Sequence, residues 1–336
     1  MKKKIVAFTL AMVFAFASVV SVQAQEKKEW IDPAEAAKVL DYQIQGEYVG
    51  DFIEDGEKTK IGMQIIAMGG GKFRAVSFTG GLPGAGWKRG DKTEYVDGEL
   101  NSSGQVVFKL EDDEGTAVAT IKNGKLTAVE GDTLVAKMEK VQRQSATMGV
   151  KPPKGAVVLF DGTAKSAANW IRGEIVLGDL LRHDVESKEK FQDHTLHLEF
   201  RTPFMPYARG QGRGNSGMYV QARYECQILD SFGLDGKNNE CGGIYSISEP
   251  IVNMALPPLV WQTYDVDFTA ARYDAGGKKV KNARVTIKHN GVVIHDDLEL
   301  THGTPGKHKE GPDPDIVYLQ GHGNPVVFRN IWAVKK

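Results

Sequence analysis

Ionisable and hydrogen-bonding side chains alternate with apolar ones along residues 223–229 of this sequence. Glu225 and Gln227 share one side of that segment with Arg223, and the residues between them are apolar or aromatic. Side chains of a β-strand point alternately to opposite faces, so the pattern predicts a strand with one polar face. A carboxylate can act as a general base, and amides and guanidinium groups form the planar hydrogen bonds that polyhydroxyl ligands require.

Three further segments repeat this design. Their polar rows are His197, Glu199 and Arg201, then Asn215, Tyr219 and Gln221, and finally Tyr318, Gln320 and His322. Segments 264–268 and 283–288 instead carry the Asp, Thr and Lys that are typical of a solvated face. We therefore predict that the four polar rows form one ligand-binding surface. The alternative is that charged pairs decorate an exposed sheet.

Asp230 lies five residues after Glu225, so strict alternation places it on the opposite face. A β-bulge near Leu229 would return Asp230 to the row of Glu225 and Gln227, and bulges are common beside active sites. We predict such a bulge.

The elements that would position these residues are almost all strands. Short alternating runs separated by Gly-rich turns extend from residue 46 to residue 141, with a predicted hairpin around Gly69–Gly71. Asp32 and Pro33 predict a short helix over residues 34–40. We predict an all-β protein with a small β-rich accessory domain at 26–148, a linker at 149–155 and a C-terminal β domain at 156–336. All eight histidines lie in that last region, which places the chemistry there.

The loop before Trp87 is rich in glycine and could present this indole to a ligand. The alternative, which we favour, is an ordered loop around a packed Trp87.

The first residues predict export. Three lysines precede an apolar run, and Val22-Gln23-Ala24 fits a signal peptidase site, so we predict a signal peptide at 1–24 rather than a membrane anchor. The mature protein is expected to be periplasmic or extracellular, without a membrane partner. The chain has 42 basic and 43 acidic residues, which argues against nucleic-acid binding. The oligomeric state is left open.

Cys226 and Cys241 are the two cysteines of the chain. An oxidising compartment permits a disulfide between them. Two buried thiols are the alternative, because Cys226 has apolar neighbours. Their spacing indicates no metal site.

The C-terminal region resembles the 3-keto-disaccharide hydrolase domain family over about residues 156–336. The matching elements are Leu159-Phe160-Asp161-Gly162 with Trp170, Asn215-Ser216-Gly217, Tyr224-Glu225-Cys226-Gln227, Gly242-Gly243-Ile244-Tyr245 and Phe328-Arg329-Asn330-Ile331. The resemblance implies a concanavalin A-like β-sandwich of the jelly-roll type. Glucanases of that fold carry three carboxylates where this chain has Glu225, Gln227 and Asp230, so ordinary retaining glycoside hydrolysis is disfavoured.

The family's implied reaction is hydrolysis of 3-keto-glycosides or disaccharides, by deprotonation at C2, elimination of the C1 substituent and addition of water. We assign catalytic roles to four residues: Glu225, His322, Asp230 and Arg201. Glu225 or His322 would be the base, and Arg201 or Arg223 would stabilise the oxyanion.

The predicted substrate-binding residues are Asn215, Tyr219, Gln221, Arg223, Gln227, Glu199, Gln320 and His183, with His183 also a candidate acid. No cofactor is required, although a divalent cation on the polar face could polarise the C3 carbonyl. Two other functions remain open. One is a non-catalytic carbohydrate-binding module, and the other is an adhesion or envelope protein whose two β domains bridge partners.

Overall fold

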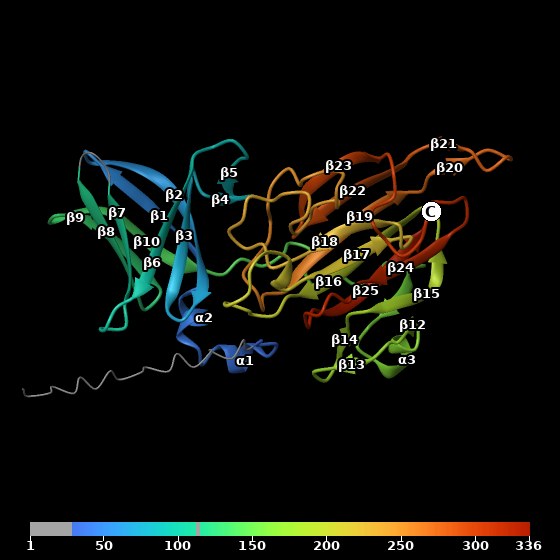
Figure 1. The fold of residues 1–336 in the computed structure, drawn as a ribbon, viewed down its shortest axis with the longest axis horizontal. Helices are drawn as coiled ribbons and strands as arrows, with labels where there is room; N and C mark the ends of the chain where they lie inside the picture. Colours follow the sequence, from blue (N-terminus) through green and yellow to red (C-terminus); the bar gives the residue numbers. More distant parts are fainter. Residues whose placement is uncertain (1–28, 112–114) are drawn as a thin grey trace, which may run out of the picture.

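The computed structural model describes residues 29–111 and 115–336, and its regular structure is almost entirely β-strand (Figure 1). The all-β prediction is confirmed. The helices are short: α1 spans Pro33–Ala36, α2 spans Leu40–Ile44, α3 spans Ala164–Ala167, and a 3₁₀ turn covers Gly210–Gly212. Within the described ranges no helix has the length and apolarity to cross a membrane. The predicted signal peptide lies outside the described residues.

The first half of the chain closes into a barrel of eight antiparallel strands, in the order β1-β10-β9-β8-β7-β6-β3-β2. The strands are β1 (Gly46–Glu54), β2 (Glu57–Gly69), β3 (Lys72–Thr79), β6 (Thr93–Leu100), β7 (Val106–Glu111), β8 (Thr116–Lys122), β9 (Lys125–Glu130) and β10 (Thr133–Val141). The predicted hairpin joins β2 to β3, where Gly69, Gly70 and Gly71 all have positive φ. Inward side chains such as Tyr48, Phe73 and Phe108 fill the barrel.

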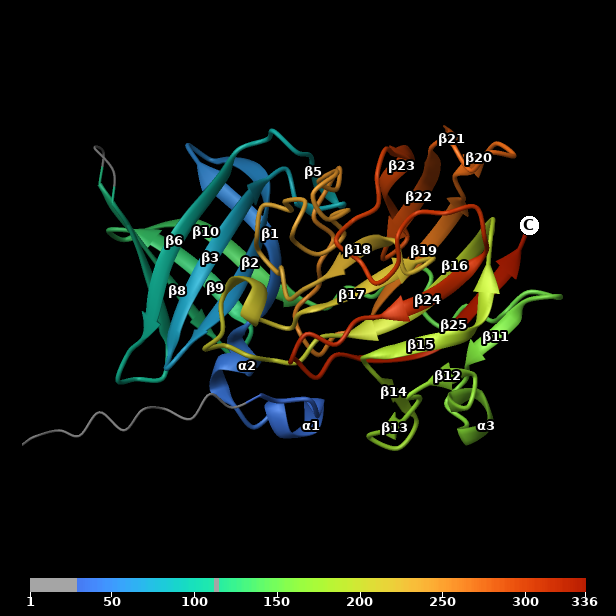
Figure 2. The ribbon, with the colours of Figure 1, turned by 45° about the vertical axis from the view of Figure 1, so that its right-hand side comes forward.

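The second half forms two antiparallel sheets. The larger has the order β13-β14-β25-β16-β19-β22-β23, with β11 paired to β25, and the smaller has the order β12-β15-β24-β17-β18. Strands of the larger sheet are β11 (Val157–Phe160), β13 (Ile175–Val176), β14 (Leu180–Arg182), β16 (His194–Arg201), β19 (Gln262–Thr269), β22 (Ala283–His289), β23 (Val292–Leu300) and β25 (Val327–Lys335). Strands of the smaller sheet are β12 (Trp170–Ile171), β15 (Val185–Phe191), β17 (Ser216–Val220), β18 (Tyr224–Ile228) and β24 (Asp315–Leu319), of which β15, β24 and β17 lie side by side in Figure 2.

Two small pairs complete the strands. β4 (Leu82–Pro83) pairs with β5 (Gly86–Trp87) on the loop between β3 and β6, and β20 (Arg272–Tyr273) pairs with β21 (Lys279–Lys281) at the far end of the molecule.

The two sheets share one apolar core, and the predicted alternation explains it. Leu196, Leu198 and Phe200 of β16 enter the core from the larger sheet, and Met218 and Cys226 of the hairpin β17–β18 enter it from the smaller. Because the apolar sides face each other, the polar sides point to opposite outer surfaces. The prediction of one surface from four polar rows is therefore wrong: the row of His197, Glu199 and Arg201 lies on the other side of the molecule.

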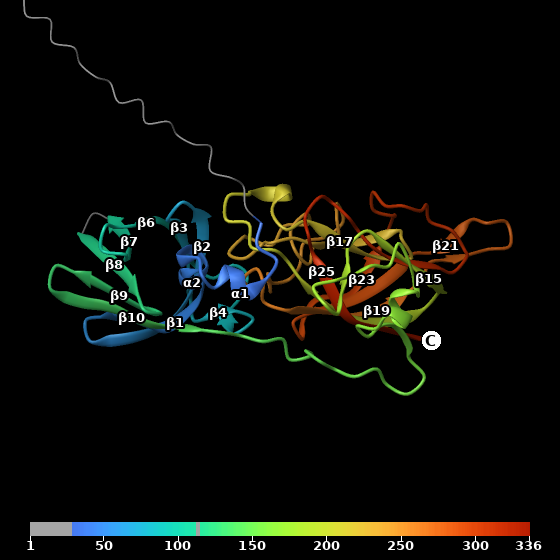
Figure 3. The ribbon, with the colours of Figure 1, turned by 90° about the horizontal axis from the view of Figure 1, so that it is seen from below.

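The segment between the barrel and the first strand of the two-sheet unit is bound rather than free. Figure 3 shows residues 142–156 running along the side of the molecule. Thr147 Oγ1 donates to Asp265 Oδ2 at 2.6 Å, and the Gly149 N–H donates to Glu199 Oε1 at 2.7 Å. The predicted linker at 149–155 contains no helix or strand, and it is fixed to the larger sheet, because Asn330 Nδ2 also donates to the Val150 carbonyl at 3.0 Å.

The predicted helix over residues 34–40 is two short helices. α1 begins at Pro33 with Asp32 as its N-cap, since Asp32 Oδ1 accepts from the Ala34 N–H at 2.8 Å. The chain then turns, and α2 begins at Leu40. The N-terminal part of the prediction is confirmed, and its length is wrong.

The barrel and the two-sheet unit contact each other through apolar packing and through arginines that donate to backbone carbonyls across the contact. Phe232, which lies on the loop after β18, packs with Ile66, Val76 and Phe78 of the barrel and is 2% exposed. Arg89 donates to the carbonyl oxygens of Asp235, Gly236, Pro250 and Ile251. Trp87 packs edge-on against Phe78 at a centroid distance of 5.3 Å. The favoured prediction, an ordered loop around a packed Trp87, is therefore confirmed.

We expect Phe232→Ala to lower the free energy of unfolding by about 3–5 kcal/mol, because the change leaves a cavity between the barrel and the loop. Urea denaturation followed by circular dichroism measures this. Phe52→Ala on β1 is the control, since Phe52 is 38% exposed and its truncation should cost at most about 0.5 kcal/mol. Equal stability of the Phe232→Ala variant and the wild type would show that this packing does not hold the two parts together.

Candidate functional site

Glu225 lies on the outer face of the smaller sheet, and its carboxylate occupies the space above a glycine. It stands opposite Tyr219 in the β17–β18 register, and Gly217 stands opposite Gln227. A Cβ at Gly217 would come within 2.4 Å of Glu225 Oε1 and 2.9 Å of the Tyr219 ring. The absence of a side chain at Gly217 therefore creates the room that the carboxylate fills.

Burial of Glu225 changes its acidity. The residue is 4% exposed, and burial raises the pKa of its carboxyl from 4.5 to about 7, although a hydrogen bond with Tyr219 opposes the shift. Because the pKa of Glu225 is higher in the folded state than in the unfolded state, protonation of this carboxyl favours folding. Its contribution to the free energy of unfolding is complete below about pH 4.5 and is lost as the pH rises through about 7. Near neutral pH the group can therefore both give and take a proton, as a general acid or base requires.

Tyr219 and Gln320 form the next part of this face. Tyr219 is buried, its hydroxyl donates to the Pro305 carbonyl at 3.3 Å, and it accepts from Gln320 Nε2 at 3.0 Å. Burial and the neighbouring Glu225 raise the pKa of Tyr219, so its hydroxyl stays protonated. The half-buried Tyr318 ring packs against it at a centroid distance of 5.4 Å.

Gln227 and Asn215 continue the face toward a glycine-rich loop. The side-chain amides of both residues donate to Gln211 Oε1, at 3.2 Å from Gln227 and 3.1 Å from Asn215. Asn215 Oδ1 is buried and has no hydrogen-bond partner within the described residues. An unsatisfied buried acceptor is costly, so this oxygen retains the capacity to accept a hydrogen bond.

The Glu225 face is defined here by the five residues Glu225, Tyr219, Gln227, Gln320 and Asn215. The structure brings all five together, as predicted. The loop between β23 and β24 covers one end of it, since Thr304 Oγ1 accepts from the Glu225 N–H at 2.9 Å.

Asp230 does not join this row, and the predicted bulge is absent. β18 ends at Ile228, and its pairing with β17 has no register shift. Asp230 Oδ2 instead accepts from Arg213 Nε at 2.6 Å in a buried ion pair. Arg213 Nη1 donates to the Ala67 carbonyl of the barrel at 3.2 Å, so Asp230 contributes to the contact between the two parts.

Arg223 and Gln221 lie at the hairpin turn rather than beside Glu225. Gln221 and Ala222 both have positive φ, and the turn carries their neighbours away from the face. Arg223 donates to the carbonyls of Gly311 and Asp313 and to Asp315 Oδ2. Gln221 Nε2 donates to the Phe191 carbonyl at 3.0 Å. Since protein atoms already engage these groups, their assignment to substrate is not supported by the geometry.

The two predicted histidines, His322 on the loop after β24 and His183 between β14 and β15, both lie near the end of β24 in space. His322 is exposed on the loop after Leu319. His183 is half-buried next to Gly321, and its Nδ1 is buried without a partner among the residues that the structure describes. Burial lowers the pKa of His183, so it is neutral near pH 7.

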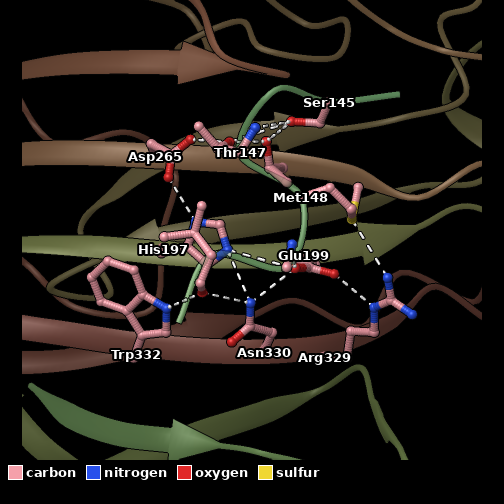
Figure 4. Close-up of polar contacts among 12 residues, drawn as sticks. Ser145, Thr147, Met148, His197, Glu199, Asp265, Arg329, Asn330 and Trp332 are labelled. Atoms are coloured by element: carbon pink, nitrogen blue, oxygen red, sulfur yellow. Dashed lines mark hydrogen bonds and ion pairs between the residues drawn. The ribbon is translucent and has the colours of Figure 1, made fainter. Parts of the chain in front are cut away.

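Glu199 and Arg201 occupy the outer face of the larger sheet, and Figure 4 shows the network around Glu199. Glu199 accepts from Arg329 Nε at 2.6 Å, from Asn330 Nδ2 at 2.8 Å and from the Gly149 N–H. Burial opposes ionisation, but these hydrogen bonds and the His197 ring, whose Nε2 lies 3.7 Å from Glu199 Oε1, lower its pKa to about 2. The hydrogen bond to Asp265 and the nearby Glu199 carboxylate raise the pKa of His197 against the opposing effect of burial. This network anchors the 142–156 segment.

Three residues near Glu225 were not assigned to the site from the sequence. Gly217 provides space, Gln211 Oε1 accepts from two side-chain amides, and the Tyr245 N–H donates to the Glu225 carbonyl at 3.3 Å. Gly217 and Tyr245 do belong to the motif elements quoted above. Gln211 lies in an irregular glycine-rich loop, for which periodicity gives no signal.

Cys226 and Cys241 are buried free thiols, which decides between the two alternatives. Burial raises the pKa of both groups. Among the described residues, no group of three or more His, Cys, Asp or Glu side chains is arranged to hold a metal ion.

Residues 155–334 match the family model of the 3-keto-alpha-glucoside-1,2-lyase-like domain. Among solved structures, a candidate glycosyl hydrolase from Parabacteroides distasonis is 29% identical with a TM-score of 0.50, covering 55% of this chain and 86% of its own. A second from the same organism is 19% identical with a TM-score of 0.38, covering 54% and 99%. A third is 16% identical with a TM-score of 0.41, covering 58% and 100%. No curated protein matches the chain.

We expect Asp230→Asn to lower the free energy of unfolding by about 3–5 kcal/mol, because it leaves the Arg213 guanidinium buried without its carboxylate. Urea denaturation measures this. Asp97→Asn is the matched control, since Asp97 pairs with Arg74 at 2.7 Å on the barrel surface, where such pairs contribute about 0.2–1 kcal/mol. An Asp230→Asn variant with wild-type stability and no turnover would instead indicate that Asp230 has the catalytic role predicted from the sequence.

Proposed function

Because the chain belongs to the 3-keto-alpha-glucoside-1,2-lyase-like family, we propose that it is a carbohydrate-active enzyme that cleaves 3-keto-glycosides on the Glu225 face. The observation that carries the proposal is a buried carboxyl with a pKa of about 7, surrounded by hydrogen-bond donors and acceptors. The likeness to a candidate glycosyl hydrolase that is 29% identical supports the substrate class.

Glu225 is the proposed base. A ketone at C3 acidifies the hydrogen at C2, because the carbanion formed there is stabilised as an enolate. Glu225 takes that proton, and the electron pair of the C2–H bond moves toward the C3 carbonyl oxygen. Collapse of the enolate then forms the C1–C2 double bond and breaks the C1–O bond. The departing oxygen takes a proton, and addition of water across the double bond completes the hydrolysis.

The proposed donors to the enolate oxygen are neutral. Arg201 lies on the opposite surface and Arg223 is occupied at the turn, so neither can stabilise the oxyanion as predicted. The Gln320 amide donates one N–H to the Tyr219 hydroxyl beside Glu225, and its second N–H is the first proposed donor. The Tyr219 hydroxyl is the second, and it would exchange its hydrogen bond to the Pro305 carbonyl for one to the enolate oxygen. Preorganised donors of this kind stabilise developing charge without solvent rearrangement.

Substrate hydroxyls are proposed to bind at the other end of the face. The unsatisfied Asn215 Oδ1 is an acceptor for one hydroxyl, and the Gln227 amide lies next to it through Gln211. Gln227 in place of a carboxylate keeps a second negative charge away from Glu225. This supports proton abstraction over a retaining mechanism, which needs two carboxylates.

We infer that the two-sheet unit is a concanavalin A-like sandwich of the jelly-roll type, that the barrel is a separate accessory domain, and that the protein is exported. His322 and His183 lie near the end of β24 and are proposed as sources of the proton for the leaving group. These steps need no cofactor, and a divalent cation would act on the same enolate.

We expect Glu225→Gln to lower kcat/KM for a chromogenic 3-keto-glucoside by about 10²–10⁴-fold, because the amide cannot accept the C2 proton. The amide has the same shape, so it preserves the packing over Gly217. Glu94→Gln in the barrel is the control and should leave turnover unchanged, since this side chain is 52% exposed.

Turnover of the Glu225→Gln variant within about tenfold of the wild type would remove Glu225 from the mechanism. Sugar binding measured by calorimetry, in a protein that turns over neither oxidised nor unoxidised disaccharides, would instead favour the non-catalytic carbohydrate-binding module.

The pH dependence of kcat/KM should report the ionisation of Glu225. A base is active when ionised, so the rate is expected to rise with pH and level off above about 7. The measurement is a pH series with the same 3-keto-glucoside, accompanied by circular dichroism to verify folding. A rate that falls through pH 7 would assign Glu225 as the acid instead.

A further inference from the structure

Arg201 is a buried cation without a carboxylate partner. It belongs to β16 on the outer face of the larger sheet and is 8% exposed. Its Nη2 donates to the Ile31 carbonyl at 3.0 Å, and its Nε is buried without a hydrogen-bond partner among the described residues. Within those residues no carboxylate oxygen lies within 4.0 Å of its guanidinium.

An unpaired buried guanidinium is unfavourable, and the neighbouring Arg329 increases the cost, whereas the more distant charges of Asp32 and Asp179 offset part of it. The Arg329 guanidinium also lies over the Trp261 ring, at 4.0 Å from the ring centroid, compared with 4.9 Å for Arg201. Burial and the positive charge of Arg329 lower the pKa of Arg201. Arg329 is neutralised by Glu199, whereas Arg201 is not. An anionic group from outside the chain would supply the missing partner.

A cavity of about 310 Å³ gives access to Arg201. Trp261 and Arg329 form part of its lining, and the exposed Asp32 and Asp179 stand at its rim. A neighbouring cavity of about 490 Å³ shares Trp261 and Arg329. The volume of the first cavity is at the lower end of the range for small-molecule sites, about 300–1,000 Å³. The second cavity adjoins it at Trp261 and Arg329 and adds further space for a ligand.

The residues of this cavity favour a particular ligand chemistry. A guanidinium binds a carboxylate with two parallel hydrogen bonds. The rim carboxylates accept hydrogen bonds from hydroxyl groups, and they repel a dianion about twice as strongly as a monoanion. An indole offers an apolar surface for the face of a sugar ring. These requirements meet in a sugar that bears a single carboxylate.

We propose that the cavity around Arg201, Trp261 and Arg329 is a second glycan site that binds a uronic acid residue of an acidic oligosaccharide. The uronate carboxylate pairs with Arg201, and the hydroxyls reach Asp32 and Asp179. This site lies on the surface opposite Glu225, because β16 and β18 face each other across the shared core. Binding there holds an acidic glycan without occupying the Glu225 face.

The test is calorimetric titration of the full mature chain with glucuronate, with glucose and with inorganic phosphate. We expect glucuronate to bind and the other two to bind at least about tenfold more weakly, since glucose lacks the charge and phosphate meets the rim carboxylates. Arg201→Met should weaken glucuronate binding by at least about tenfold while the circular dichroism spectrum stays unchanged.

Trp261→Ala is the second variant and should also weaken glucuronate binding, so the test holds even if Arg201→Met does not fold. Arg284→Gln is the matched control, because Arg284 of β22 has a side chain that is 35% exposed and pairs with Asp297, and binding to this variant should equal that of the wild type. Absence of glucuronate binding would overturn the proposal, as would unchanged binding in a folded Arg201→Met variant. Phosphate binding as strong as glucuronate binding would also overturn it, in favour of a general anion site.

Discussion

The shared apolar core of the two sheets is the constraint on which the rest of this structure depends. Each contributing strand gives every second side chain to that core, so the remaining side chains must point outward. Leu198 and Phe200 enter from one sheet, and Met218 and Cys226 enter from the other. The polar residues therefore separate into two outer surfaces with different partners and different chemistry, although their strands have the same pattern in the sequence.

On the smaller sheet, the local consequence is a carboxyl group placed where it is hard to ionise. Gly217 leaves the space, Tyr219 closes one side, and Thr304 binds the backbone of Glu225 from the covering loop. Loss of hydration raises the pKa of Glu225 to about 7, which is suited to proton transfer at neutral pH. The buried hydroxyl and amides around it are neutral, so they tune the site by hydrogen bonding rather than by charge.

On the larger sheet, the buried carboxylate of Glu199 is ionised and paired with a cation, unlike Glu225. Glu199 lies among Arg329, Asn330 and the Gly149 N–H, and its low pKa follows from these contacts. This side anchors the segment that leaves the barrel. The contact with the barrel itself comes from residues that flank the open end of the β17–β18 hairpin, namely Arg213 with Asp230, and Phe232. Arg201 is the exception, because its guanidinium has no carboxylate partner among the described residues. It therefore gives the strongest reason to look for a ligand on this surface.

The sequence by itself determined the strand character of the segments that carry the polar rows and which of their side chains are apolar, because alternation is a local property. The hairpin β17–β18, the polar row of Glu225 and Gln227, and the turn at Gly69–Gly71 all followed from it. Only the tertiary structure decided which polar rows share a surface, because that depends on the sheet to which each strand belongs. It also decided that Arg223 and Asp230 are engaged by protein atoms, and that Gly217 makes room for Glu225, since these contacts join residues whose distances no spacing encodes.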